Sequence, residues 1–122
     1  MHVGVAITTP SGLAVPCVRD AQDKSVEEIA VDISRLRRLA VERRLERGDI
    51  EGATITLSNI GSIGLVSGIG VVHPTQTALV AVGREVEGEV RVTVSADHRV
   101  VDGRDLGEFL GAFRKGLLLG GG

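Results

Sequence analysis

A seven-residue segment near the C-terminus concentrates side chains that can carry out acid–base chemistry. Its sequence is Asp97-His98-Arg99-Val100-Val101-Asp102-Gly103. A histidine suits general base catalysis because its unperturbed pKa lies close to neutral pH. The segment connects a predicted strand to a predicted helix, and rigid elements on both sides can hold such a loop in place. His98 is therefore a candidate base. The alternative is that His98 is an ordinary turn residue, while Asp102 and Asp105 cap the helix that follows.

A second candidate segment is rich in hydroxyls and glycines, and its sequence is Thr56-Leu57-Ser58-Asn59-Ile60-Gly61-Ser62-Ile63-Gly64. A hydroxyl at the end of a strand, beside glycines that let a ligand approach the backbone, suits an oxyanion donor or a phosphate site. The glycine spacing fits neither a P-loop nor a dinucleotide-binding motif, and no lysine follows. A simple polar turn is the alternative interpretation of this segment.

The other reactive side chains do not form a recognisable site. The single cysteine, Cys17, lies in an apolar run, which predicts a buried, inert thiol and excludes an internal disulfide. The three histidines, His2, His73 and His98, lack the paired spacing of a metal site, so no metal is expected.

An arginine-rich stretch between residues 35 and 47 has six arginines against two glutamates, a local charge of +4. Such a stretch can attract a phosphorylated cofactor. It can equally be a solvated helix face whose charges pair locally.

The composition of the 122-residue chain excludes several classes of protein. Its 43% hydrophobic and 25% charged residues are typical of a globular domain. A net charge of −2, with no tryptophan, no tyrosine and two phenylalanines, argues against a nucleic-acid partner. No apolar run reaches the length of a membrane helix, and no secretory signal is visible at the start. We therefore expect a cytoplasmic protein without a membrane partner.

Hydrophobic periodicity predicts an α/β fold in one domain, residues 1–122. Strands are expected at 3–8, 13–18, 53–58, 77–82 and 90–96, with a turn at 9–12. A helix is expected from Ser25 to Arg47, begun by a Ser25–Glu28 capping box and ended by Gly48. The apolar stripe predicted for this helix comprises Val26, Ile29, Ile33, Leu36 and Ala40. A second helix is expected at 104–117, and the closing glycines, 120–122, should fray. The element order indicates a mixed β-sheet with flanking helices.

These segments together resemble the catalytic domain of the dihydrolipoamide acyltransferases, the core subunits of the 2-oxo acid dehydrogenase complexes. The matching blocks, in order, are Val3-Gly4-Val5-Ala6, Thr9-Pro10 with Gly12 to Pro16, Lys24-Ser25 with Glu28-Ile29-Ala30, Gly52 to Gly64, Ala81-Val82-Gly83-Arg84 and Ser95 to Gly103. The resemblance covers nearly the whole chain. It places the chain in the C-terminal half of that domain, without the lipoyl and peripheral subunit-binding domains.

The resemblance implies a fold like chloramphenicol acetyltransferase, assembled as trimers that build a 24- or 60-subunit core. It implies acyl transfer between dihydrolipoamide and coenzyme A, the two substrates, with no metal. The family's catalytic histidine corresponds to His98, its oxyanion-stabilising hydroxyl to Ser58 and its loop-orienting Asp or Asn to Asp102. In the family the histidine meets a serine of the neighbouring subunit. The dehydrogenase and dihydrolipoamide dehydrogenase components would bind through the absent domains.

The alternative to an enzyme is a catalytically silent fragment that acts as a structural assembly module of the complex core. Its apolar strands and the C-terminal Leu117-Leu118-Leu119 would then hold subunits together.

Overall fold

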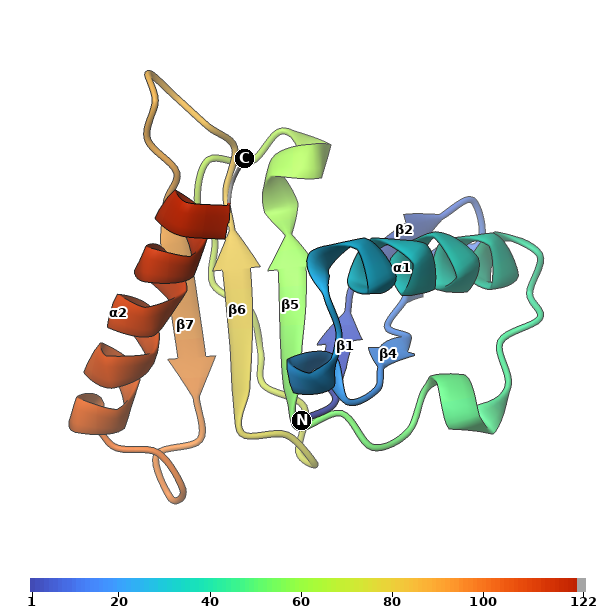
Figure 1. Cartoon of the computed structure of the whole chain (residues 1–122), viewed down its shortest axis with the longest axis horizontal. Helices are drawn as coiled ribbons and strands as arrows, with labels where there is room; N and C mark the ends of the chain where they lie inside the picture. The colour runs from blue at the N-terminus through green and yellow to red at the C-terminus, as the bar shows by residue number, and fades with distance from the viewer. Residues whose placement is uncertain (121–122) are drawn as a thin grey trace.

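A five-stranded mixed sheet organises the chain (Figure 1). The computed structural model describes the backbone of residues 1–120 and the side chains of residues 1–117. The strands lie in the order β4 (Cys17–Val18), β1 (Val3–Val5), β5 (Ile55–Asn59), β6 (Ala78–Val82) and β7 (Val92–Ala96). The three central strands run parallel, while β4 and β7 at the two edges run antiparallel to their neighbours. The predicted α/β class with a mixed sheet is confirmed.

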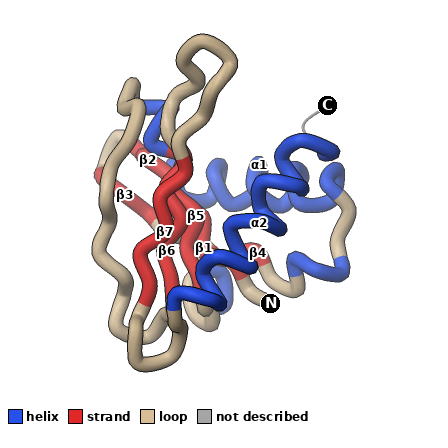
Figure 2. The backbone as a smooth tube through the Cα atoms, turned by 90° about the vertical axis from the view of Figure 1, so that its left-hand side faces the viewer, coloured by secondary structure: helices blue, strands red, loops and turns tan. Residues whose placement is uncertain are grey.

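Different elements cover the two faces of this sheet. Helices α1 (Val26–Val41) and α2 (Gly103–Gly120) lie on one side. Figure 2 shows the hairpin of β2 (Ile7–Thr9) and β3 (Gly12–Ala14) on the other side, together with a long loop. Three short 3-10 helices complete the fold, at Ala21–Asp23, Arg47–Asp49 and Ile60–Ile63. Within residues 1–120, no helix has the length and apolar content needed to cross a bilayer.

The best-buried side chains lie where α1 packs against the sheet. Leu36 and Ala40 of α1 are buried, as is Val18 of β4, which α1 contacts. Val80 of β6 is also buried. Ile29 and Ile33 are half-buried on the same stripe of the helix, as predicted. Val26 was wrongly included in this stripe, since it is 69% exposed. It lies in the first turn of α1 and at the margin of the stripe, so the helix turns it away from the sheet.

The first helix begins as predicted but ends earlier. The Ser25 hydroxyl accepts a hydrogen bond from the Glu28 N–H at 3.1 Å, which caps the helix. The predicted end at Arg47 is wrong, because α1 stops at Val41. Arg43 takes the left-handed conformation (φ 56°), which cannot continue a right-handed helix.

The two predicted N-terminal strands are each divided in two. Their outer parts, β1 and β4, pair in the main sheet, whereas β2 and β3 form a separate hairpin. Pro16 lies at the bend, where it lacks an N–H for the ladder. Its carbonyl accepts instead from the Val5 N–H at 2.8 Å. The remaining strands and α2 match their predicted ranges to within three residues.

The loop after β5 is fixed against the end of β6 by a close backbone approach. The Arg84 N–H donates to the Leu65 carbonyl at 2.8 Å. A Cβ atom added at Gly83 would lie 1.8 Å from the Val66 carbonyl oxygen. Only glycine therefore fits at this position, and the approach holds the loop over the sheet.

We expect Gly83→Ala to lower the free energy of unfolding by about 2 kcal/mol or more, because the new methyl group must displace backbone. The matched control is Gly111→Ala in α2, where an added Cβ meets nothing within 4 Å. That substitution should stabilise the chain by about 0.5–1 kcal/mol through helix propensity. Urea unfolding, monitored by circular dichroism, measures the free energy of unfolding of each variant. Equal effects of the two substitutions would contradict the close packing at Gly83.

Candidate active site

The loop between β7 and α2 is held by the two side chains that flank His98. The Arg99 guanidinium donates to both carboxylate oxygens of Asp97, from Nε at 3.0 Å and from Nη2 at 2.9 Å. The Arg99 backbone N–H donates to the same carboxylate at 3.0 Å. These bonds hold the pKa of Asp97 below its usual range. His98 itself is exposed and has no hydrogen-bond partner among the described residues.

Asp102 caps the second helix. Its Oδ1 accepts from the Asp105 N–H at 2.9 Å, while the Asp102 N–H donates to Asp105 Oδ2 at 3.1 Å. This reciprocal pair is a capping box, the structural role that the sequence left open. The Asp102 carboxylate therefore orients the end of the loop, and within one chain no hydrogen bond joins it to His98 in the described structure.

Ser58 lies near the end of β5 and lines a cavity of about 970 Å³. The cavity is lined by residues of β5, of the β2–β3 hairpin with Val15, and of the segment that precedes β6. Figure 2 shows that hairpin and that segment on the side of the sheet away from the helices. Its walls are mostly apolar, with Leu13, Val15 and Leu79 among them. The Ser58 hydroxyl has no hydrogen-bond partner within the part of the chain that the structure describes.

The strand pairing keeps Ser58 and His98 apart within one chain. Ser58 pairs with Ala81 of β6, and Ala81 pairs with Thr93 of β7. Ala96, the last residue of β7, lies three positions after Thr93, and the His98 loop follows it at the opposite end of the sheet (Figure 1). Strand spacing and rise put Ser58 and Ala96 about 14 Å apart. One chain therefore does not bring the two predicted residues together.

The remaining sequence candidates have structural explanations. Cys17 is 3% exposed, as predicted, and burial raises the pKa of its thiol, which works against a reactive thiolate. No group of three histidine, cysteine or acidic side chains suited to a metal ion occurs among the described residues.

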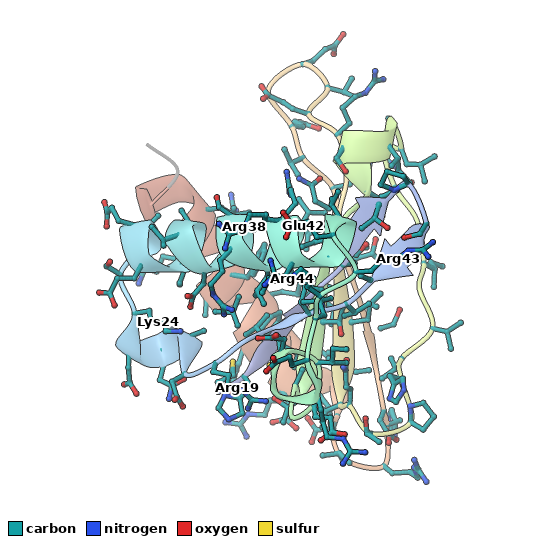
Figure 3. The ribbon with its side chains drawn as sticks, turned by 90° about the vertical axis from the view of Figure 1, so that its right-hand side faces the viewer. Arg19, Lys24, Arg38, Glu42, Arg43 and Arg44 are labelled. Atoms are coloured by element: carbon teal, nitrogen blue, oxygen red, sulfur yellow. The ribbon has the colours of Figure 1, made fainter. Side chains whose placement is uncertain are left out.

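Three of the six arginines in the arginine-rich stretch pair with nearby carboxylates. Ion pairs join Arg35 to Asp49, Arg44 to Glu42 and Arg47 to Glu51. Figure 3 labels Arg38, Glu42, Arg43 and Arg44, which come from the last turn of α1 and the residues directly after it. Cations at a helix C-terminus also interact favourably with its dipole. These local pairs agree with the interpretation of a solvated, locally paired surface for Arg35, Arg44 and Arg47.

Two further residues, Gln76 and His73, line the cavity although the sequence does not predict them as members of a site. Gln76 accepts a hydrogen bond from the buried Thr56 hydroxyl at 2.5 Å, and His73 lies in the same turn. The alternation of Thr54, Thr56 and Ser58 indicates that three hydroxyls share one face of β5. Nothing in the sequence, however, indicates which distant turn faces them.

Comparisons with curated proteins identify relatives in two kinds of complex. The chain is 35% identical over 122 residues to the dihydrolipoyllysine-residue acetyltransferase component of the pyruvate dehydrogenase complex of Mycoplasma capricolum, covering 90% of this chain and 28% of that protein. It is 39% identical over 121 residues to the mitochondrial lipoamide acyltransferase component of the branched-chain alpha-keto acid dehydrogenase complex of Arabidopsis thaliana, covering 88% and 25%. The chain thus spans between a quarter and a third of the length of these relatives.

Solved structures share the fold. The dihydrolipoamide acetyltransferase of Azotobacter vinelandii, studied for the catalytic roles of a serine, a histidine and an asparagine, matches with a TM-score of 0.86 and 28% identity, over 96% of this chain and 53% of that one. The truncated catalytic core of the 2-oxoacid dehydrogenase complex from Thermoplasma acidophilum matches with a TM-score of 0.84 and 32% identity, over 93% and 55%. The mixed sheet and its two helices are therefore those of the acyltransferase cores, over about half of their length.

The model of one family, the catalytic domain of the 2-oxoacid dehydrogenase acyltransferases, matches residues 1–118. With nearly the whole described chain matched and the fold shared, the protein belongs to the 2-oxoacid dehydrogenase acyltransferase family.

Proposed function

We propose that this chain is the C-terminal portion of a dihydrolipoamide acyltransferase catalytic domain and transfers an acyl group between coenzyme A and dihydrolipoamide. The observation that carries the proposal is the His98 loop. Two hydrogen-bonded pairs, Asp97–Arg99 and Asp102–Asp105, fix its ends and leave the imidazole free. A rigid loop with one uncommitted histidine suits a general base better than a structural turn.

The relatives support the same assignment of roles. A serine, a histidine and an asparagine, in that order along the chain, are the residues investigated in the Azotobacter enzyme. Ser58, His98 and Asp102 follow the same order here. Asp102 has a carboxylate where that enzyme has an amide, and both side chains can accept the capping hydrogen bond that Asp102 accepts.

The chemistry follows from these three side chains. The neutral His98 ring takes the proton of a thiol as its sulfur attacks the carbonyl carbon of the thioester. The carbonyl oxygen becomes an oxyanion, which the Ser58 hydroxyl stabilises by a hydrogen bond. The tetrahedral intermediate then collapses, and the departing thiolate takes the proton back from His98. The acyl group passes directly between two thiols, so Cys17 has no part in the reaction.

The separation of Ser58 and His98 in one chain makes the proposed site an intersubunit site. The Ser58 of one copy must meet the His98 of another, because strand pairing puts them at opposite ends of the sheet. A heterologous contact of this kind closes into a ring, such as a trimer. A related structure forms the cubic core of a pyruvate dehydrogenase complex. We therefore propose trimers within a 24- or 60-subunit core. The proposal also includes a cytoplasmic location and dehydrogenase partners that bind through other domains.

The second candidate, a silent assembly module, is favoured by the outer side of α2. Leu110 and Leu117 remain 38% and 47% exposed, although they follow the same apolar pattern as the half-buried Phe109 and Phe113. An apolar helix face that its own chain covers incompletely suits contact with other subunits. The Leu118 and Leu119 side chains, also predicted to take part, lie outside the described residues.

His98→Ala should abolish acyl transfer, and Ser58→Ala should lower kcat by about 10²–10³ with a smaller change in KM, since the hydroxyl acts on the transition state. The assay follows transfer from acetyl-, isobutyryl- and succinyl-coenzyme A to dihydrolipoamide. Wild-type rates in His98→Ala would rule out the proposed base. A folded wild-type assembly without activity toward any donor would favour the silent module instead.

Mixing the two inactive variants tests whether the site forms between subunits. In an equal mixture of His98→Ala and Ser58→Ala chains, refolded together, random assembly into rings gives about a quarter of the interfaces both wild-type residues. Activity should therefore return to about a quarter of the wild-type level, because each variant supplies the group that the other lacks. Either variant refolded alone is the control. An inactive mixture of confirmed mixed assemblies would contradict a site shared between two chains.

The two substitutions Asp102→Ala and Asp102→Asn separate the capping role from the charge. Alanine should lower the free energy of unfolding by about 1 kcal/mol, since it cannot accept the Asp105 N–H, whereas asparagine should be nearly neutral. Thermal unfolding measures stability, and the transfer assay measures whether activity follows the cap. If Asp102→Asn loses as much activity as Asp102→Ala, the negative charge itself is required.

A further inference from the structure

The cavity beside Ser58 is elongated along β5. Thr54, Thr56 and Ser58 all line it, because alternate residues of a strand share one face. The Thr77 N–H donates to the Thr54 carbonyl at 2.8 Å, which ties the start of β6 to the Thr54 end of the cavity. The turn of His73 to Gln76 comes directly before, closed by a 2.8 Å bond from the Gln76 N–H to the His73 carbonyl. Ser58 and His73 therefore lie toward opposite ends of the cavity. The rise of the strand puts Thr54, at the His73 end, about 13 Å from Ser58.

The hydrogen bonds within the turn determine which nitrogen of His73 is available. Nδ1 accepts from the Thr75 backbone N–H at 3.2 Å and lies 2.8 Å from the Thr75 hydroxyl. A nitrogen that accepts a backbone N–H carries no proton, so the proton of the neutral ring is on Nε2. Nε2 has no protein partner among the described residues. His73 thus presents one free donor at an exposed end of an apolar cavity.

The polar groups midway along the cavity are engaged with each other. The Thr56 hydroxyl, 5% exposed as a residue, donates to the Gln76 side-chain oxygen. A ligand lying along β5 therefore meets a hydroxyl at Ser58, an apolar stretch with a satisfied polar pair, and a free N–H donor at His73. The matching ligand is an extended hydrocarbon arm with a thiol or thioester at one end and a carbonyl acceptor at the other.

We propose that His73 is a specificity-determining residue that binds the amide carbonyl of the dihydrolipoamide arm. This inference rests on the proposed function, because it places the reacting thioester at Ser58. An eight-carbon arm extends about 10 Å from its terminal thiol to its amide at ordinary bond lengths. A hydrogen bond of about 3 Å from the amide carbonyl to a donor brings its reach to the roughly 13 Å along β5. The pantetheine arm of coenzyme A has two amides, and the second lies as many bonds from its thiol as the dihydrolipoamide amide does. Its first amide, however, would lie midway along the cavity, where Thr56 and Gln76 already pair with each other and leave it no partner.

The test compares two thiol acceptors, dihydrolipoamide and octane-1,3-dithiol, which has the same dithiol chain without the amide. His73→Ala should raise KM for dihydrolipoamide about threefold to tenfold, the effect of one lost neutral hydrogen bond. Its kcat, its KM for acyl-coenzyme A and its kcat/KM for octane-1,3-dithiol should equal those of the wild type. His73→Gln, which retains a side-chain N–H donor, should restore much of the lost affinity.

Equal losses with both thiols would overturn the proposal and leave His73 a structural role in its turn. A rise in KM confined to acyl-coenzyme A would overturn it as well. Titrating the protein with each thiol and following the His73 imidazole by NMR tests the binding role of His73 without requiring acyl transfer. A failure of this proposal can therefore be distinguished from a failure of the proposed function. Dihydrolipoamide should shift the Cε1–H resonance of His73 and octane-1,3-dithiol should not, whether or not the protein turns over. Identical responses to the two ligands would again reject the assignment.

Discussion

The antiparallel pairing of β7 with β6 is the constraint on which the proposed chemistry depends. Because β5 and β6 run parallel, Ser58 lies toward their carboxyl ends, while β7 carries the chain back before the His98 loop begins. A sheet register cannot slip by one residue without exchanging its two faces, so this separation is a fixed property of the fold. If both side chains act on one thioester, each chain supplies Ser58 to one site and His98 to another, and neither site is complete within one chain.

Local hydrogen bonds explain why the His98 loop is ordered although it is exposed. Asp97 with Arg99 and Asp102 with Asp105 are close in sequence, so little chain entropy is lost in forming either pair. The two pairs also use up the carboxylates nearest the imidazole. An arrangement that satisfies its acids locally leaves the His98 imidazole free for the role proposed for it, in which another chain brings the reacting group.

Much of the fold followed from short-range patterns, and the errors have long-range or conformational causes. The strands at Ile55–Asn59 and Ala78–Val82 have the β-branched and apolar residues that predict them, and Ser25 caps α1 as expected. The end of α1 was missed because it depends on the left-handed conformation of Arg43, a residue with no such preference. The division of the first two strands depends on which partner each half finds in space.

The residues of the candidate site likewise differ in whether a short-range sequence pattern indicates them. His98 and Asp102 could be proposed from the sequence because their segment is compact and chemically dense, whereas His73 stands fifteen residues after Ser58 in a turn without such a pattern. Its relation to Ser58 exists only because β5 and β6 are parallel, which requires the connecting chain to cross back over one face of the sheet and start β6 beside Thr54. The same crossover that closes the sheet thus also encloses the cavity, and the turn at its end is the natural place for a residue that recognises the far end of a substrate.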